Sequence, residues 1–230
     1  MDIDKLEQQY SELKKTTSYS EHQNFISQLL SSDDPEVLDF HFKLLKDREN
    51  WNFYTRLRSA FKKRGLIIED FLIDKIQNES DSSLKADALH LLGQIGSQKA
   101  VPIARNFINS DSSSLRETAC YVIGWLGSKD DVDHIADRVF NDPDNEIRAT
   151  AATSLDQIRL RIPETKEKLT SILKKALENE KDEETLAWII ITLQYIMEKK
   201  FGLKENIDEA EWSGDVEKAK QRALKSLADL

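Results

Sequence analysis

Apolar residues recur along this chain at helical spacing, most clearly between residues 115 and 126. Leu115, Ala119, Val122, Ile123 and Leu126 fall at positions i, i+4, i+7, i+8 and i+11. Residues at these intervals lie on one side of an α-helix. The spacing therefore predicts an amphipathic helix that buries this stripe against its neighbours.

The same pattern occurs three times in succession. Residues 84–96 align with residues 115–127 after a shift of 31 residues, and these align with residues 147–158 after a shift of 32. At the centre of each copy stands a small residue: Ala88, Ala119 and Ala151. A repeat of this length is typical of a solenoid, in which each unit buries its apolar face against the next.

The pattern extends in both directions as pairs of helices. Beside the three aligned segments, first helices are expected at 53–65 and 185–196 and second helices at 66–77, 100–109, 132–141 and 165–179. Flanking helices are expected at 4–15, 20–30, 35–46 and 215–228, with a polar connection over 205–214. No segment predicts a strand. Because helix 184–199 is apolar nearly all round, we expect the C-terminal segment, with Trp212 and Leu224, to cover Ile191 and Tyr195.

These elements predict an all-α protein, a right-handed α-solenoid of about five or six helix pairs with helical caps. We expect one domain over residues 1–230. Residues 1–50 would form a degenerate N-terminal repeat and cap, residues 51–201 the main repeats, and residues 202–230 a linker and a capping helix. Atypical ends are expected because exposed end repeats need polar faces.

The aligned segments resemble short HEAT-like repeats, the type also found in phycobilisome lyases. The turn at 142–144, Asp-Pro-Asp, leads into Ile-Arg at 147–148, and residues 92–96 read Leu-Gly-Gln-Ile-Gly. The resemblance covers residues 82–158, with Lys85 in place of the usual arginine and Asp156 in place of a glycine. It implies that second helices line the concave side. Such proteins serve as scaffolds, inhibitors, bacterial immunity proteins, pigment lyases and, in one branch, DNA glycosylases.

Charge and hydropathy limit the classes of partner and the cellular location that we expect. Of the 230 residues, 33 are Lys or Arg and 42 are Asp or Glu, which gives a formal net charge of −9. This balance disfavours nucleic acid, whose phosphates need clustered cations. It favours a basic partner or serves solubility alone, which is the commoner role of such a charge. The longest apolar run, residues 187–191, is too short to span a bilayer, and the N-terminus is acidic without the apolar core of a signal peptide. We expect a cytoplasmic protein, monomeric when free, with no membrane partner.

Candidate chemistry is sparse. None of the four histidines stands at a metal-ligand spacing, and Cys120 beside Ala119 is expected to be a packed thiol. We expect no enzyme, no cofactor, no metal and no catalytic residue. The basic cluster over 56–64 is expected to face solvent on the convex side. A DNA glycosylase would need a basic concave face, and a pigment lyase a covalent site for its chromophore, and the sequence supplies neither.

Seven residues are candidates for partner binding. Tyr121 and Trp125 occupy outward positions one turn apart on a first helix, where exposed aromatic residues commonly anchor protein interfaces. The alternative is that a neighbouring element of the chain covers the two rings. Acidic residues cluster on the second helices: Asp131, Asp133 and Asp137 in one, and Asp70 and Asp74 in another. The carboxylates would pair with Lys or Arg of the partner, and the two rings would anchor it.

The predicted function is the binding of one protein partner without chemistry. In its sharpest form the hypothesis is a bacterial immunity or inhibitor protein that neutralises a basic toxin such as a nuclease. The alternative is a general HEAT-repeat scaffold or regulatory adaptor. A pigment-lyase-like or glycosylase-like enzyme is a third class. The acidic second helices disfavour the glycosylase, and the lack of a covalent site for a chromophore disfavours the lyase.

Overall fold

The computed structural model describes residues 2–206 and 211–228. Over this range the chain forms thirteen α-helices, four short 3-10 helices and one two-stranded hairpin. It divides into two compact units, unit 1 (residues 1–97) and unit 2 (residues 98–230). In each unit, helices adjacent in sequence pack together, and the fold is the all-α solenoid predicted from the repeats. The single domain over residues 1–230 stays a prediction.

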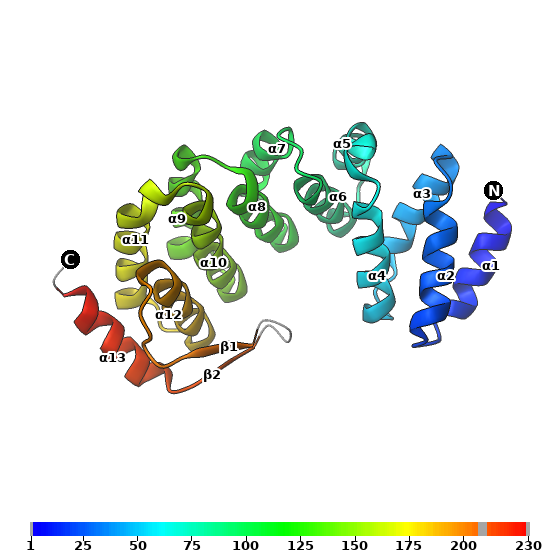
Figure 1. Ribbon diagram of the computed structural model, residues 1–230. Coiled ribbons are helices and arrows are strands. Elements are labelled where there is room, and N and C mark those ends of the chain that lie inside the picture. Colours follow the sequence, from blue (N-terminus) through cyan, green and yellow to red (C-terminus); the bar gives the residue numbers. More distant parts are fainter. Residues whose placement is uncertain (1, 207–210, 229–230) are drawn as a thin grey trace. The chain divides into compact units, whose positions relative to one another are not determined.

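Unit 1 contains six α-helices. They are α1 (Ile3–Leu13), α2 (Tyr19–Leu30), α3 (Pro35–Lys43), α4 (Trp51–Lys62), α5 (Glu69–Asn78) and α6 (Ser82–Gln94). Two 3-10 turns, η1 (Leu44–Lys46) and η2 (Gly65–Ile68), join them. α4 packs against α2 and α6, and α5 packs against α6 (Figure 1). Helix starts follow the capping rule, since Ser18, Asp34, Asn50 and Asp81 accept hydrogen bonds from first-turn amides.

The arginines of the predicted basic cluster are engaged inside unit 1, which corrects the expectation that they face solvent. Arg56 Nη1 donates to His22 Nδ1 at 2.7 Å. Arg58 Nη1 lies 3.4 Å from the carboxylate of Asp87. Arg64 donates to two carbonyls at the end of α2, at 2.8 and 3.0 Å. The helical wheel places a side chain on a face but does not show that a long arginine can reach a group on a neighbouring helix, here α2 or α6.

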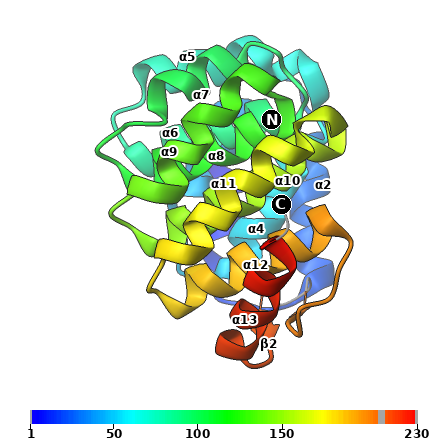
Figure 2. The same ribbon diagram turned by 90° about the vertical axis from the view of Figure 1, so that its left-hand side faces the viewer.

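Unit 2 contains seven α-helices and the hairpin. The helices are α7 (Ala100–Phe107), α8 (Ser113–Leu126), α9 (Val132–Asn141), α10 (Asn145–Arg161), α11 (Lys166–Asn179), α12 (Glu183–Met197) and α13 (Val216–Leu227). The 3-10 turns η3 (Lys129–Asp131) and η4 (Pro163–Thr165) precede α9 and α11. α10 lies between α8 and α12 and packs against both, which makes one layer of first helices. The second helices α9 and α11 pack side by side in another layer (Figure 2).

Small residues set the close approach of α8 and α10. Ala119 and Ala151 are fully buried at the centres of these helices, as the repeat pattern predicts. A Cβ on Gly124 would lie 3.1 Å from Ser154 Cβ and 3.2 Å from its carbonyl oxygen. A larger side chain there would force the helices apart, because their backbones nearly touch.

The C-terminal segment differs from the prediction. In place of a polar connection, β1 (Lys204–Asn206) pairs antiparallel with β2 (Glu211–Ser213), so that Glu205 lies opposite Trp212. These strands are too short to show an alternating pattern in the sequence. α13 packs against α11 and α12, and Ile191 is buried as predicted. Tyr195 is instead 47% exposed and donates from its hydroxyl to Glu205 Oε2 at 2.5 Å.

Candidate partner-binding groove

The first helices of unit 2 line a groove of about 700 Å³. Its lining comes from α8 (Glu117 and Tyr121), α10 (Asn145, Glu146, Ala149, Thr150 and Thr153), α12 (Glu184 and Trp188) and β1 (Glu205). The volume lies in the range of ligand pockets, about 300–1,000 Å³. The groove belongs to the layer of first helices, whereas the HEAT resemblance led us to expect the ligand face on the second helices.

Helical spacing explains which side chains meet in the groove. The α10 residues follow at steps of one, four, five and eight, so they share one face and form the floor. Each wall is a pair one turn apart, Glu117 with Tyr121 in α8 and Glu184 with Trp188 in α12. The groove therefore has a carboxylate and an aromatic ring on each side.

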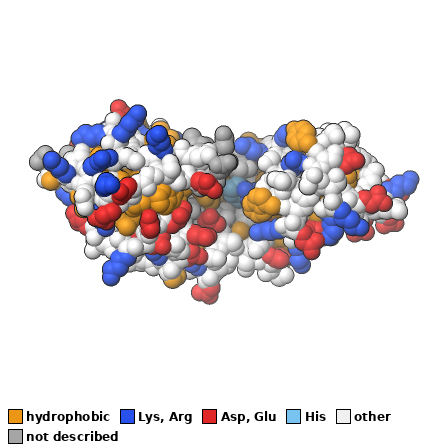
Figure 3. All heavy atoms as spheres, turned by 90° about the horizontal axis from the view of Figure 1, so that it is seen from below, with side chains coloured by type: hydrophobic (Ala, Val, Ile, Leu, Met, Phe, Trp, Pro, Cys, Tyr) orange, Lys and Arg blue, Asp and Glu red, His pale blue; other side chains and the backbone are white. Residues whose placement is uncertain are grey.

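The charged side chains that line the groove are all acidic. Among the described residues that line it, four are glutamates and none is Lys, Arg or His. Figure 3 views this face, with acidic side chains gathered beside hydrophobic ones over unit 2 in its left half. Glu146 and Glu184 lie in the first turns of α10 and α12, where the positive end of the helix dipole stabilises a carboxylate. The groove is therefore suited to a cationic ligand.

The aromatic rings at the groove are held in place. Tyr121 and Trp125 stack with ring centroids 5.7 Å apart and planes 19° from parallel. Trp188 Nε1 donates to Glu184 Oε1 at 3.0 Å. Rings already fixed in this way lose little conformational freedom when a partner binds, which favours affinity.

Asp131, one of the predicted contact residues, is a structural carboxylate. Its side chain is 1% exposed and accepts from Arg105 Nε at 2.5 Å and Nη2 at 2.9 Å. It also accepts from the backbone amide of Ser128 at 2.7 Å. Burial raises the pKa of Asp131, but the hydrogen bonds from Arg105 and Ser128 outweigh it, and the pKa is lowered overall. A partner could reach this group only by breaking the start of α9.

Asp133 and Asp137 are exposed on α9, in the layer of second helices and outside the groove lining. Asp133 Oδ1 lies 2.7 Å from Lys168 Nζ. Asp137 contacts Arg138 and accepts from Asn141 Nδ2 at 2.7 Å. Their role in binding stays a prediction. A partner that contacts these two aspartates would do so outside the groove that Tyr121 lines.

Asp70 and Asp74 lie on α5 of unit 1, both exposed and one turn apart, as the spacing predicts. Asp74 Oδ1 accepts from Asn78 Nδ2 at 2.8 Å. They and the groove belong to different units, and their role also stays a prediction.

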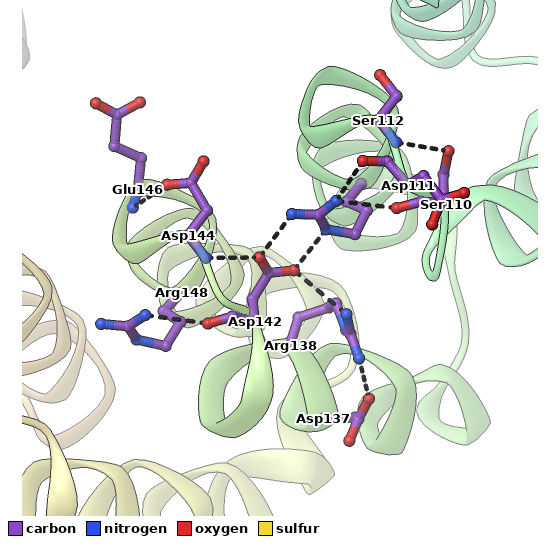
Figure 4. A network of polar contacts seen from close by, with 10 residues as sticks. Ser110, Asp111, Ser112, Asp137, Arg138, Asp142, Asp144, Glu146 and Arg148 are labelled. Atoms are coloured by element: carbon purple, nitrogen blue, oxygen red, sulfur yellow. Dashed lines mark hydrogen bonds and ion pairs between the residues drawn. The ribbon is translucent and has the colours of Figure 1, made fainter.

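A buried ionic network joins the repeats (Figure 4). Arg116 donates to Asp142 through Nε at 2.9 Å and Nη2 at 3.0 Å, and Arg138 Nη1 lies 3.3 Å from the same carboxylate. In the next repeat Arg148 donates in the same bidentate way to Glu180, at 2.7 and 3.1 Å. The arginines of the repeat pattern thus bind the loop that opens the following repeat, which fixes the spacing of the groove helices.

Cys120 and His134 are not part of the groove lining. Cys120 is buried, and burial raises the pKa of its thiol, so it is the packed residue predicted. His134 is exposed on α9. Within residues 2–206 and 211–228, no three His, Cys, Asp or Glu side chains are grouped so that they could hold a metal ion.

The comparisons identify the repeats. A family model of HEAT repeats matches residues 69–156, so the resemblance is confirmed over that stretch. None of the curated proteins matches the chain. HEAT repeats generally mediate protein interactions, and proteins built of them are typically noncatalytic scaffolds. No helix in the described part of the chain is both long and apolar enough to cross a lipid bilayer.

Nine of the ten described groove residues were absent from the predicted site, among them all that are charged and one of the two aromatic residues: Glu117, Glu146, Glu184, Trp188 and Glu205. The sequence does contain a pattern that could have indicated the two groove walls. In both α8 and α12, a Glu is followed four residues later by an aromatic residue. The more numerous acidic residues of the second helices favoured a site there instead. Of the predicted residues, Tyr121 alone belongs to the described groove lining, and its role in binding stays a prediction.

Proposed function

We propose that this chain is a noncatalytic protein-binding scaffold whose unit 2 groove holds a positively charged segment of a partner protein. The observation that carries the proposal is the lining itself, which in the described part of the chain combines four carboxylates with two aromatic rings and contains no cation. Such a surface attracts Lys and Arg over a distance and then gives them rings to pack on. The net charge of −9 adds to the attraction.

In its particular form the proposal is a cytoplasmic immunity or inhibitor protein, monomeric when free, that neutralises a basic toxin such as a nuclease. The acidic charge and the HEAT scaffold support this form. Asp133, Asp137, Asp70 and Asp74 would then extend the acidic contact surface beyond the groove. The alternative form is a general scaffold or regulatory adaptor, which would bind several proteins through the same groove.

The test is recovery of partners from the source cell with the full chain as bait, at low and moderate salt. One basic protein recovered in equal amount, and less of it at higher salt, is the result expected of the inhibitor. Several unrelated proteins, all dependent on the groove, would establish the scaffold. Recovery of nucleic acid in place of protein would overturn both forms.

A pair of variants locates the binding surface. Glu146→Gln with Glu184→Gln removes two charges from the groove, and Glu167→Gln with Glu178→Gln removes two from exposed positions on α11. Hydrogen bonds to charged groups contribute roughly 1.5–3 kcal/mol each, so the groove variant should bind at least about tenfold more weakly. Equal loss in both variants would show that only net charge matters and that the groove is not the site.

A further inference from the structure

The rings and carboxylates of the groove are arranged as neighbouring pairs rather than as separate clusters. On the α12 wall, the hydrogen bond from Trp188 Nε1 to Glu184 Oε1, at 3.0 Å, ties one ring to one carboxylate. Trp188 is half-buried, so part of its ring is accessible from the groove. A cation entering here meets an aromatic surface and a negative charge together.

The α8 wall repeats this arrangement with different residues. Glu117 and Tyr121 stand one turn apart, and Tyr121 is backed by the stacked ring of Trp125. The floor between the walls is small and polar, formed by Ala149, Thr150 and Thr153. Short floor side chains leave depth for a long side chain to lie along α10 with its charged end against a wall.

From this geometry we infer that the groove selects arginine over lysine in the partner segment. The inference rests on the proposed function, because it assumes that a basic segment occupies the groove. A guanidinium is planar, so it stacks on an indole or phenol ring while its N–H groups point in its own plane toward a carboxylate. A lysine ammonium is compact and more strongly hydrated, and it offers no flat surface to the ring.

Trp188 is the residue on which the selection depends most. Trp gives the strongest attraction for a cation over its face among the aromatic side chains, and guanidinium groups occur there more often than ammonium groups. Glu184 acts with it by accepting hydrogen bonds from the stacked guanidinium. The lysine form of the same segment still gains the charge attraction but not the stacking.

Two short blocked peptides, one of alternating Gly and Arg and one of alternating Gly and Lys, test the inference by calorimetric titration of the full chain. The arginine peptide should bind about tenfold more tightly at the same ionic strength. Equal affinity for the two peptides would overturn the selection and leave the proposed function standing. Binding of neither peptide would overturn the proposed function together with the inference.

Trp188→Leu separates stacking from charge. It should weaken the arginine peptide by roughly 3- to 30-fold, the range of a partly desolvated cation–π contact, and change the lysine peptide little. Trp51→Leu is the matched control, since Trp51 is 61% exposed on α4 of unit 1. If Trp188→Leu melts early, Glu184→Gln, which keeps the size of the side chain, takes its place and should reduce the preference for arginine. A preference unchanged in both groove variants would contradict the inference.

Discussion

At the scale of single residues, aspartates near α9 serve different purposes. Asp142 is fully buried and carries the bidentate pair with Arg116 and a contact with Arg138. The side chain of Asp133 is 76% exposed. Its ion pair with Lys168 lies at the protein surface. A buried ion pair is costly to break, because removing one partner leaves an uncompensated charge inside the protein, while an exposed pair is screened by water.

Asp142→Asn should lower the free energy of unfolding by about 3–5 kcal/mol, because Arg116 and Arg138 would lose their shared carboxylate. Asp133→Asn should change it by no more than about 1 kcal/mol. Urea titration followed by circular dichroism measures both values. A small effect of Asp142→Asn, similar to that of Asp133→Asn, would mean that water replaces the lost acceptor and that the network does not set the repeat spacing.

Asp131 shows why the site could be predicted only in part from the sequence. It sits in the same acidic run as Asp133, and helical spacing treats both as surface residues. What separates them is Arg105, which lies in the preceding second helix and donates twice to Asp131. A pattern of single positions does not reveal such a partner, because the pairing depends on the packing of neighbouring repeats. Tyr121 could be found because its position follows from the repeat alone.

At the scale of elements, the helices were predictable and the hairpin was not. The period of the apolar positions gave α9 with the bounds the structure shows, and it placed α8 and α10 within a few residues. β1 and β2 have three residues each, of which the outer two are exposed and the middle one is half-buried, and neither strand has an apolar run. The hairpin depends instead on two glycines at its base, Gly202 and Gly214, whose φ angles are +117° and +129°.

Gly214→Ala should therefore loosen the hairpin and the start of α13. A Cβ at this position would lie 2.6 Å from the carbonyl oxygen of Gly202, and the φ angle is unfavourable for any L side chain. We expect a loss of about 1–3 kcal/mol in the free energy of unfolding. Faster hydrogen exchange of the β1 and α13 amides would localise the effect. Ser213→Ala, one residue earlier and exposed, is the control and should leave exchange unchanged.

The hairpin also bears on the groove, since Glu205 of β1 is part of its lining. If Gly214→Ala weakens binding of the basic partner as well as local stability, the hairpin helps to form the binding surface. Loss of stability without loss of affinity would confine the hairpin to a capping role for α12 and α13.

At the scale of the whole molecule, the two units differ in the groups that respond to acid. Unit 1 buries three histidines, His22, His41 and His90, and the pKa is lowered in the last two. Burial lowers the pKa of His41 to about 3, with a further contribution from Arg64, and burial lowers the pKa of His90 to about 3, with Arg58 and Lys62 adding to it. The only histidine of unit 2, His134, is exposed. Unit 2 holds carboxylates with a lowered pKa, such as Asp142, where the pair with Arg116 outweighs burial.

The units should therefore lose stability in different pH windows. The unfolded chain protonates its histidines below about pH 6.5 while folded His41 and His90 stay neutral, so protons favour unfolding of unit 1. Each histidine lowers the free energy of unfolding by at most about 1.4 kcal/mol per pH unit between pH 6.5 and 3. A carboxylate with a lowered pKa stabilises above its unfolded value near pH 4 and loses this effect only below it.

Hydrogen exchange with mass spectrometry, corrected for the intrinsic effect of pH, resolves the two units in the intact chain. Between pH 6.5 and 4.5, amides of α4 and α6 should lose protection while those of α8 and α10 keep theirs. His90→Gln should flatten the response of unit 1, because it removes one proton-binding site of the unfolded chain. His134→Gln is the matched control in unit 2, because His134 is exposed, and it should leave the response of unit 1 unchanged. Parallel loss of protection in both units would mean that the buried histidines do not govern the response, and that acid acts through the carboxylate network alone.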